Sequence, residues 1–468
     1  MAVGLGGFAV ERAKAQCDDA GCDPTFLAPK YFGTYTYPFG IAAGDVNGDF
    51  TLDIAVACRH SEYLVPGNPI IDESPAVVMV FENNGTWTTT QHGFPNLPKL
   101  ITFESSDPLA DWAPTEVVFA DLDGDEVPEL VVTAGTKVPG ETGGSGLYVF
   151  ERDPSGEWFL RQYISDHGLR GLAVADFNAD GLMDVAAAYD FQQEIVPAQE
   201  YANFVRFWRN DPANPGDLIQ VQPPSGQPDH FSTGVMFPYY EEPTPAACED
   251  LVVADFDKLT LWPGGARPDI ITGNYLNADR GTFFVNRTQS PDFTFRQPPT
   301  DMLEPACSNP VDLWGNHAMA AERFRPTMQA WDLAVYKAGW VHVLRGNGRG
   351  VFAYDCPEAA VPDRYEIIPN AQCVQIEPKG GIATGDLNAN GKPDIAVTVA
   401  HCREVHWLLG KGNGKFRYAN TTVYSEEVPD GVFPIQVIIA DLNGDGKGDI
   451  LTTNHLSPEF GLAVLIGQ

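Results

Sequence analysis

The sequence predicts an all-β protein, a seven-bladed β-propeller with four-stranded antiparallel blades in which the N- and C-terminal strands close one shared blade. Three observations lead to this fold class. An acidic nine-residue loop between two apolar runs recurs seven times. Further strand signals follow each loop, which gives the four strands of a propeller blade. An orphan strand signal at Phe26 to Phe32 matches the strand that the last repeat lacks.

Five copies of the acidic loop carry oxygen-bearing side chains at positions 1, 3, 5 and 9, and position 7 would add a backbone carbonyl. A hard cation such as Ca²⁺ takes six to eight oxygen ligands, which this spacing can supply, whereas Mg²⁺ keeps more of its waters. Glycine or another small residue at position 4 or 6 permits the sharp turn. The alternative is a set of Asx-rich hairpin turns that hold no ion. The predicted ligands of about five Ca²⁺ sites are Asp45, Asn47, Asp49, Thr51 and Asp53; Asp121, Asp123, Asp125, Val127 and Glu129; Asp176, Asn178, Asp180, Leu182 and Asp184; Asp386, Asn388, Asn390, Lys392 and Asp394; and Asp441, Asn443, Asp445, Lys447 and Asp449.

The remaining two copies are altered and receive no predicted metal site. In the fourth, Asp255 and Asp257 begin the pattern, but an insertion delays the closing acid to Asp269. In the fifth, the loop runs from Glu322 to Asp332 and lacks ligands at positions 3 and 5. Both copies keep their flanking strand signals, so the count of seven stands.

The strand signals after each loop set the blade boundaries. In the first repeat they are Val77 to Phe81 and then 83–87; in the second they are Leu147 to Phe150 and then 156–160. Residues 25–468 therefore form one domain. Its predicted blade cores are 41–96, 117–165, 172–222, 251–298, 318–355, 381–424, and 437–468 together with 25–36.

The N-terminal segment and the cysteines bear on the compartment. Residues 1–24 contain an apolar stretch and a small-residue motif at Ala13 to Ala15, which could be the remnant of an export signal. The eight cysteines form no CxxC unit, and their even number favours disulfides, with buried free thiols as the alternative. Local pairs such as Cys17 with Cys22 and Cys356 with Cys373 are plausible. We expect an extracellular, periplasmic or cell-surface location.

Charge and hydropathy argue against binding to nucleic acid or anionic lipid and against a membrane span. The chain has 63 acidic and 29 basic residues and a net charge of −34, which disfavours binding to nucleic acid or to anionic lipid. It has no apolar run of about 20 residues, so the sequence predicts no membrane span.

Two segments resemble the FG-GAP, or VCBS-like, repeat family, which includes the propeller of the integrin alpha chain. They are Gly385 to Val397 (GDLNANGKPDIAV) and Leu408 to Phe416 (LLGKGNGKF). The resemblance extends over nearly the whole chain through the repeated loops. It implies calcium bound between the first two strands of a blade and ligands engaged on the opposite face.

The residues that follow each second strand would surround the central axis on that opposite face, where the long segments 97–115, 227–249, 301–317 and 367–379 are also expected. Three histidines fall at comparable positions in neighbouring blades. They could hold a transition metal, or one could act as a general base beside a cationic side chain, or they could be ordinary polar loop residues. The candidate catalytic residues are His60, His401, His455, Arg59, Lys337 and Arg403, and the candidate ligand-binding residues are Arg59, His60, Lys137, Asp190, Asn274, Tyr275, Asn454 and His455.

Three functions remain compatible with the sequence. The favoured one is an extracellular binding module for a glycan or protein ligand, in which calcium stabilises the propeller. The alternative is a polysaccharide lyase that uses the histidine, tyrosine and cationic residues of the opposite face. A structural subunit of a surface complex is the third. No nucleophile elbow or phosphate-binding loop points to hydrolase or kinase chemistry.

Overall fold

The structure of the chain is a computed structural model. It describes residues 23–35, 37–59, 76–103, 107, 109, 112–136, 144–166, 169–189, 204–221, 231–232, 247–257, 267–275, 282–286, 288, 295–296, 318–337, 339–348, 352–353, 364–367, 380–423, 433–455 and 458–468. These residues form seven antiparallel sheets, and their helical turns are the short 3₁₀ segments η4 (Ala400–Cys402) and η5 (Pro458–Phe460). None of the described helical segments could cross a membrane.

The sheets follow one another along the chain. The first contains β2 (Pro38–Gly44), β3 (Asp53–Cys58), β4 (Val77–Phe81) and β5 (Lys99–Ile101). The second contains β6 (Trp112–Ala120), β7 (Glu129–Thr136), β8 (Gly146–Arg152) and β9 (Trp158–Ser165). The third contains β10 (Leu169–Ala175), β11 (Asp184–Tyr189), β12 (Phe204–Asn210), β13 (Leu218–Gln220) and β14 (Phe231–Ser232). The fourth contains β15 (Ala247–Ala254), β16 (Asp269–Tyr275), β17 (Thr282–Asn286) and β18 (Phe295–Arg296).

The remaining sheets come from the second half of the chain. The fifth contains β19 (Ala318–Glu322), β20 (Asp332–Lys337), β21 (Trp340–Gly346), β22 (Phe352–Ala353) and β23 (Arg364–Glu366). The sixth contains β24 (Ile382–Gly385), β25 (Asp394–Val399), β26 (Glu404–Gly410) and β27 (Phe416–Val423). The seventh contains β28 (Phe433–Ala440), β29 (Asp449–His455), β30 (Leu462–Leu465) and β1 (Lys30–Phe32).

The N-terminal strand joins the last sheet, as the sequence predicts. β1 pairs antiparallel with β30, with Tyr31 opposite Ala463. A bridge between Phe26 and Gly467 extends the pairing. The seventh sheet therefore draws its strands from both ends of the chain.

Two details differ from the sequence prediction. Residues 83–87 are not a strand, and the fourth strand of the first sheet is β5 instead. The backbone N–H of Asn83 is engaged by the Asp53 carboxylate, which ends the strand at this point. The third and fifth sheets also contain a fifth strand each. In the third sheet, β13 pairs with one end of β12 and β14 pairs with its other end. In the fifth sheet, β22 and β23 pair with the two ends of β21 in the same way, so that less of the strand edge is left unpaired.

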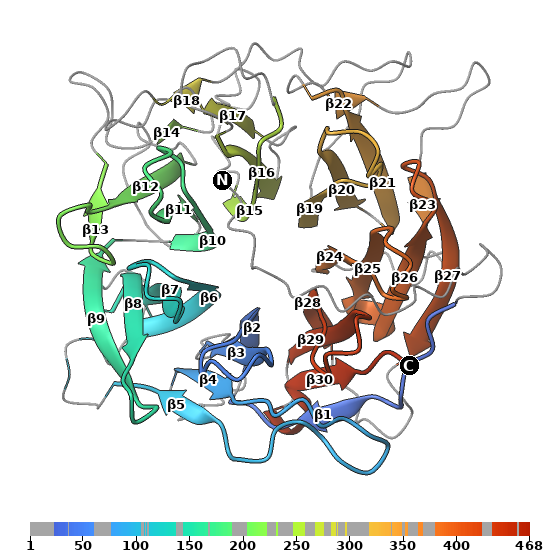
Figure 1. Cartoon of the computed structure of the whole chain (residues 1–468), viewed down its shortest axis with the longest axis horizontal. Coiled ribbons are helices and arrows are strands. Elements are labelled where there is room, and N and C mark those ends of the chain that lie inside the picture. Colours follow the sequence, from blue (N-terminus) through green and yellow to red (C-terminus); the bar gives the residue numbers. More distant parts are fainter. Residues whose placement is uncertain are drawn as a thin grey trace, which may run out of the picture.

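The seven sheets lie side by side in a circle, with the first strand of each nearest the centre (Figure 1). Neighbouring first strands contact each other all the way round, and β28 of the last sheet contacts β2 of the first. Because each strand pair begins or ends at an acidic loop, these loops lie at one end of the sheets and the ends of the second strands lie at the other.

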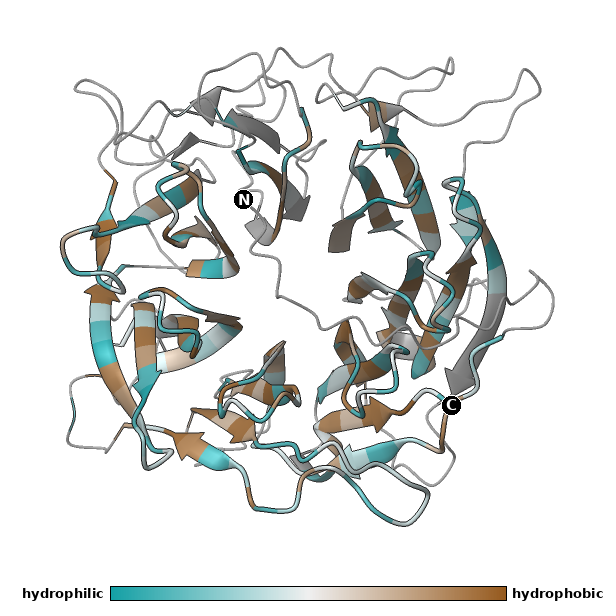
Figure 2. Ribbon diagram, viewed as in Figure 1, coloured by the Kyte–Doolittle hydropathy of each residue, from teal (hydrophilic) through white to brown (hydrophobic). Residues whose placement is uncertain are grey.

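The core consists of apolar clusters between neighbouring sheets. One cluster packs Ile54 and Val56 of the first sheet against Leu451 and Val464 of the seventh, and comparable clusters fill each of the other junctions. The second strands are buried on both faces, and several of them, such as β3 and β25, are nearly continuous apolar runs rather than alternating ones. Brown, apolar stretches run through the sheets in Figure 2.

Buried asparagines link neighbouring sheets at the end where the acidic loops lie. The side-chain amide of Asn83 donates to the carbonyl oxygen of Leu442 at 2.8 Å. Asn210 donates in the same way to Leu122 at 2.6 Å, and Asn286 donates to Phe177 at 2.8 Å. Each asparagine ends or follows a third strand, and each acceptor lies at position 2 of the preceding sheet's acidic loop. These bonds satisfy buried carbonyl groups and fix each sheet against the one before it.

We expect the substitution Asn83→Ala to lower the free energy of unfolding by about 2–3 kcal/mol, because it leaves the buried carbonyl of Leu442 and the Trp87 indole N–H without their partner. Urea unfolding followed by circular dichroism measures the change in the free energy of unfolding. The matched control is Asn84→Ala, whose exposed side chain should matter by less than about 0.5 kcal/mol. Equal losses in the two variants would contradict the linking role of Asn83.

Candidate metal sites and the opposite face

The acidic loops are folded by their own side chains. In the first loop, the Asp45 carboxylate accepts the N–H groups of Gly48 and Phe50, each at 2.8 Å. In the last loop, Asp441 accepts the N–H of Gly446 at 2.8 Å. Positions 4 and 6 have left-handed backbones, with φ of 73° at Gly48 and 67° at Phe50. These hydrogen bonds hold the loop in a tight turn.

The acid at position 9, called the closing carboxylate below, is fully buried in each loop. Asp53 accepts the N–H of Val46 at 3.0 Å through Oδ2 and the N–H of Asn83 at 2.7 Å through Oδ1. One donor lies at position 2 of the loop, and the other lies at the end of the third strand. The same pair of hydrogen bonds recurs at Asp184, Asp269, Asp394 and Asp449.

Burial raises the pKa of these closing carboxyl groups. The pKa reaches about 7 at Asp53, Asp184, Asp394 and Asp449, and about 8 at Asp269. Hydrogen bonds from backbone N–H groups oppose the shift, and the other loop acids add to it by repulsion. Such a cluster of oxygen atoms is stabilised in its ionised form when a cation lies nearby.

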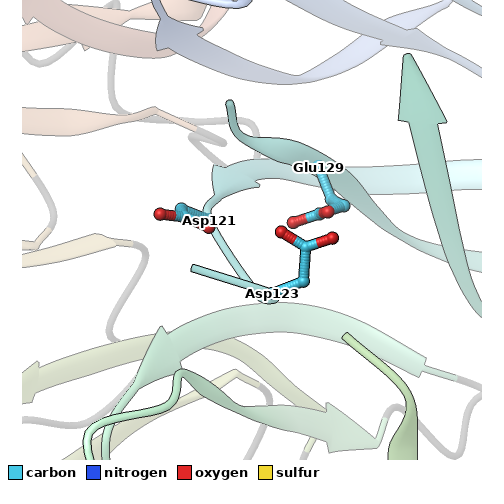
Figure 3. Close-up of side chains that lie close together, drawn as sticks. All are labelled: Asp121, Asp123 and Glu129. Atoms are coloured by element: carbon cyan, nitrogen blue, oxygen red, sulfur yellow. The ribbon is translucent and has the colours of Figure 1, made fainter. Parts of the chain in front are cut away.

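Three carboxylates converge in two of the loops within the described part of the chain. The oxygen atoms of Asp121, Asp123 and Glu129 lie within 4.8 Å of one another (Figure 3). Those of Asp255, Asp257 and Asp269 do so in the fourth loop. The sequence predicts no complete ligand set in the fourth loop, because an insertion separates Asp257 from Asp269. The pairing of Ala254 with Asp269 places Asp269 at the position of a closing acid.

The fifth loop aligns one residue away from the sequence prediction. Glu322 pairs with Asp332, the place that Ala120 holds opposite Glu129 in the second loop. Glu322 therefore precedes position 1, and Arg323 and Arg325 occupy positions 1 and 3. The loop retains its closing carboxylate and carries two cationic side chains where the others carry ligands.

At the opposite end of the sheets, three residues meet between the first and seventh sheets. The ring of His455, at the end of β29, contacts the ring of Tyr37 edge to face at 4.5 Å between centroids. The backbone N–H of Arg59 donates to the carbonyl of Tyr37 at 3.0 Å. All three side chains are half-buried, and Tyr37 has a left-handed backbone with φ of 51°. Such a conformation is unusual for a bulky residue, and strained backbones cluster at functional sites as well as in turns.

The sequence predicted Arg59 and His455 for this end but missed Tyr37. No sequence signal marks it, because a residue before proline is expected to be extended. Asn454 requires a correction. It is fully buried, its amide donates to the carbonyl of Phe460 at 2.6 Å and its oxygen accepts from Thr452, so it supports the sheet and does not face a ligand.

The other predicted residues of this face are only partly described. Lys337 ends β20, and Arg403 follows η4 with a left-handed φ of 57°; both are half-buried. Only the backbones of His401, Asn274 and Tyr275 are described. His60, Lys137 and Asp190 lie outside the described residues, as do most of the four long segments expected on this face.

Comparison with known proteins identifies the repeat in one part of the chain. Residues 386–452, which run from the sixth acidic loop into the seventh sheet, match the FG-GAP-like repeat model. No curated protein matches the chain. The match supports the FG-GAP resemblance and covers two of the loops at which the oxygen pattern is complete.

One similar solved structure is described as the "structural basis of specific recognition of non-reducing terminal N-acetylglucosamine" by a lectin of Agrocybe aegerita. It is 17% identical in sequence and aligns with a TM-score of 0.43, covering 75% of this chain and 79% of that chain. A likeness at this level carries no functional argument.

In the presence of a chelator, we expect the melting temperature to fall as the pH rises from about 5 to about 8. The closing carboxyl groups keep their protons up to about pH 7 in the folded chain, whereas the unfolded chain releases them near pH 4. Between these values the folded state binds more protons, so raising the pH removes stability. Scanning calorimetry measures the trend. A melting temperature that rises throughout this window would contradict it, and a saturating divalent cation should reduce the fall.

Proposed function

We propose that this chain is a calcium-stabilised, seven-bladed β-propeller that acts outside the cytoplasm as a binding module for a glycan or protein ligand. The proposal rests on one observation: the acidic loops and the candidate ligand residues lie at opposite ends of the sheets. The acidic loops gather at one end of the sheets, and the half-buried group of Tyr37, His455 and Arg59 lies at the other. The cation would stabilise the scaffold, and the ligand would bind at the end that the cation leaves free.

The chemistry of the loops supports calcium as the cation. Their side chains offer only oxygen ligands from carboxylates and amides, which suits a hard cation of flexible coordination. The loops of the first, third, sixth and seventh sheets would hold it with side chains at positions 1, 3, 5 and 9 and the backbone carbonyl at position 7. A bound cation would also offset the cost of burying the closing carboxylate.

The aromatic group supports ligand binding at the opposite end. Tyrosine, histidine and arginine together present apolar ring surface with polar tips, and tyrosine and arginine are enriched where binding energy concentrates. The guanidinium of Arg59 would favour a ligand with carboxylate groups, such as an acidic sugar or an acidic peptide.

Two observations support a location outside the cytoplasm. Cys402 is disulfide-bonded, and stable disulfides form in oxidising compartments. The calcium sites proposed above also suit a medium with abundant calcium. Cys58 is the buried free thiol among the described residues.

Calcium removal should lower the thermal stability of the chain. Linkage gives about 2.7 kcal/mol for each site held at a hundredfold excess of calcium over its dissociation constant. The variant Asp441→Asn should lose part of this stabilisation, whereas Glu322→Gln should retain it, because Glu322 precedes its loop. Calorimetry with and without chelator measures both. Indifference to the chelator would refute calcium stabilisation, and equal losses in the variants would refute the loop assignment.

A screen of glycans and polysaccharides in calcium buffer tests the binding function, with retention and the ultraviolet absorbance of unsaturated uronate products recorded together. For a retained ligand, we expect His455→Ala and Arg59→Ala to weaken binding about tenfold or more. His92→Ala is the matched control, because His92 is exposed and packs on Phe32 instead. Unchanged binding in both variants would contradict this ligand end. Product that disappears in His455→Ala would establish the lyase alternative.

A further inference from the structure

Arg161 lies against the second acidic loop, where the sequence predicts a complete set of metal ligands. It belongs to β9, the outer strand of the same sheet. One guanidinium nitrogen, Nη1, lies 3.1 Å from Asp123 Oδ2 and 3.7 Å from Glu129 Oε1. These are the position 3 ligand and the closing carboxylate. A fixed positive charge therefore already contacts two of the three converging acids of Figure 3.

The rest of the guanidinium is held by groups outside the loop. Nη1 also lies 3.2 Å from Glu151, Nε lies 3.5 Å from Asp217, and Nη2 donates to the carbonyl of Pro215 at 2.7 Å. Pro215 and Asp217 belong to the turn between β12 and β13 of the third sheet. The side chain is only 19% exposed. Arg161 thus has partners on three sides, and displacing it would leave Glu151 and Asp217 without their counter-charge.

The neighbouring sheet leaves space for this side chain. Gly216, with φ of 94°, lies in the same turn, and a Cβ built there would come within 2.5 Å of the Arg161 Cζ atom. A side chain at position 216 would require the guanidinium to move. The position of Arg161 is a built contact between two sheets rather than a surface ion pair.

The fifth loop contains the same arrangement without an intact ligand set. Arg325 bonds both oxygen atoms of the closing carboxylate Asp332, through Nε at 3.1 Å and through Nη2, and Nη2 also donates to the carbonyl of Gly346 at 2.6 Å. Its stem packs against Gly414, a left-handed glycine in the corresponding turn of the sixth sheet. In both loops an arginine supplies the positive charge, and a glycine of the next sheet makes room for it.

We propose that Arg161 is the resident cation of the second acidic loop and that this loop binds no divalent cation, although its sequence matches the calcium pattern. The inference rests on the calcium binding proposed above for the other loops. The guanidinium occupies two of the ligands that Ca²⁺ would need, and a divalent cation placed beside it would be repelled. The positive charge beside these two carboxylates is then permanent and independent of the calcium concentration.

Calcium titration of the full chain by isothermal titration calorimetry tests this, after removal of bound cations. We expect Asp121→Asn to bind the same number of calcium ions as the wild type, Asp441→Asn to bind one fewer, and Arg161→Gln to bind one more. Arg161→Lys keeps the positive charge and should gain none. Circular dichroism confirms that each variant is folded, and if Arg161→Gln fails to fold, Asp121→Asn decides the question.

The outcomes separate this inference from the proposed function. Loss of one calcium ion in Asp121→Asn, to match Asp441→Asn, would overturn the role of Arg161 while leaving calcium stabilisation intact. If the wild type binds no calcium, calcium stabilisation fails, and Arg161→Gln alone decides: one ion gained supports the inference, and none overturns it.

Discussion

The buried closing carboxylate is the constraint on which the rest of the structure depends. It begins the second strand of every sheet, and in most sheets it accepts both the N–H at loop position 2 and a second N–H from the end of the third strand. It therefore holds three chain segments in one register. Burying a negative charge is costly unless it is paired, so the same group that organises each sheet also requires a positive partner.

The chain provides a positive partner for the closing carboxylate in two ways. Most loops surround the closing carboxylate with further oxygen atoms, so a proton or a cation from the medium must offset the negative charge. The second and fifth loops instead bring an arginine to the carboxylates. The first solution depends on the medium, because an ion must be present. The second is fixed by the sequence, because arginine stays protonated at all physiological pH values.

The sequence reveals most of the repeat because its signals are local. Spacing within nine residues predicts the loops, and apolar runs predict the strands on both sides of them. Long-range features are not visible in the same way. Arg161 lies 32 residues after Glu129, and nothing between them indicates that β9 brings it back to the loop. In the fifth loop, acidic residues alone place Glu322 at position 1, which is one residue early. The buried Phe324, which matches Leu122 and Phe177 at position 2, gives the correct register.

The arginines of the second and fifth loops also affect how firmly neighbouring sheets are joined. Arg161 contacts the turn of the third sheet, and Arg325 packs against the turn of the sixth, so each arginine also joins its sheet to the next. The ion pair of Arg161 with Asp217 and the packing of Arg325 against Gly414 do not require a bound cation. At the junctions of the seventh sheet with the first and of the third sheet with the fourth, the asparagine links and the apolar clusters act beside loops that have no such arginine in the described residues. Under the proposed calcium binding, loss of calcium should loosen these junctions unevenly. The junction between the seventh and first sheets, which carries Tyr37 and His455, is among those without an arginine of this kind in the described residues. Under the proposed function, calcium bound at one end thereby supports the geometry of the ligand group at the other.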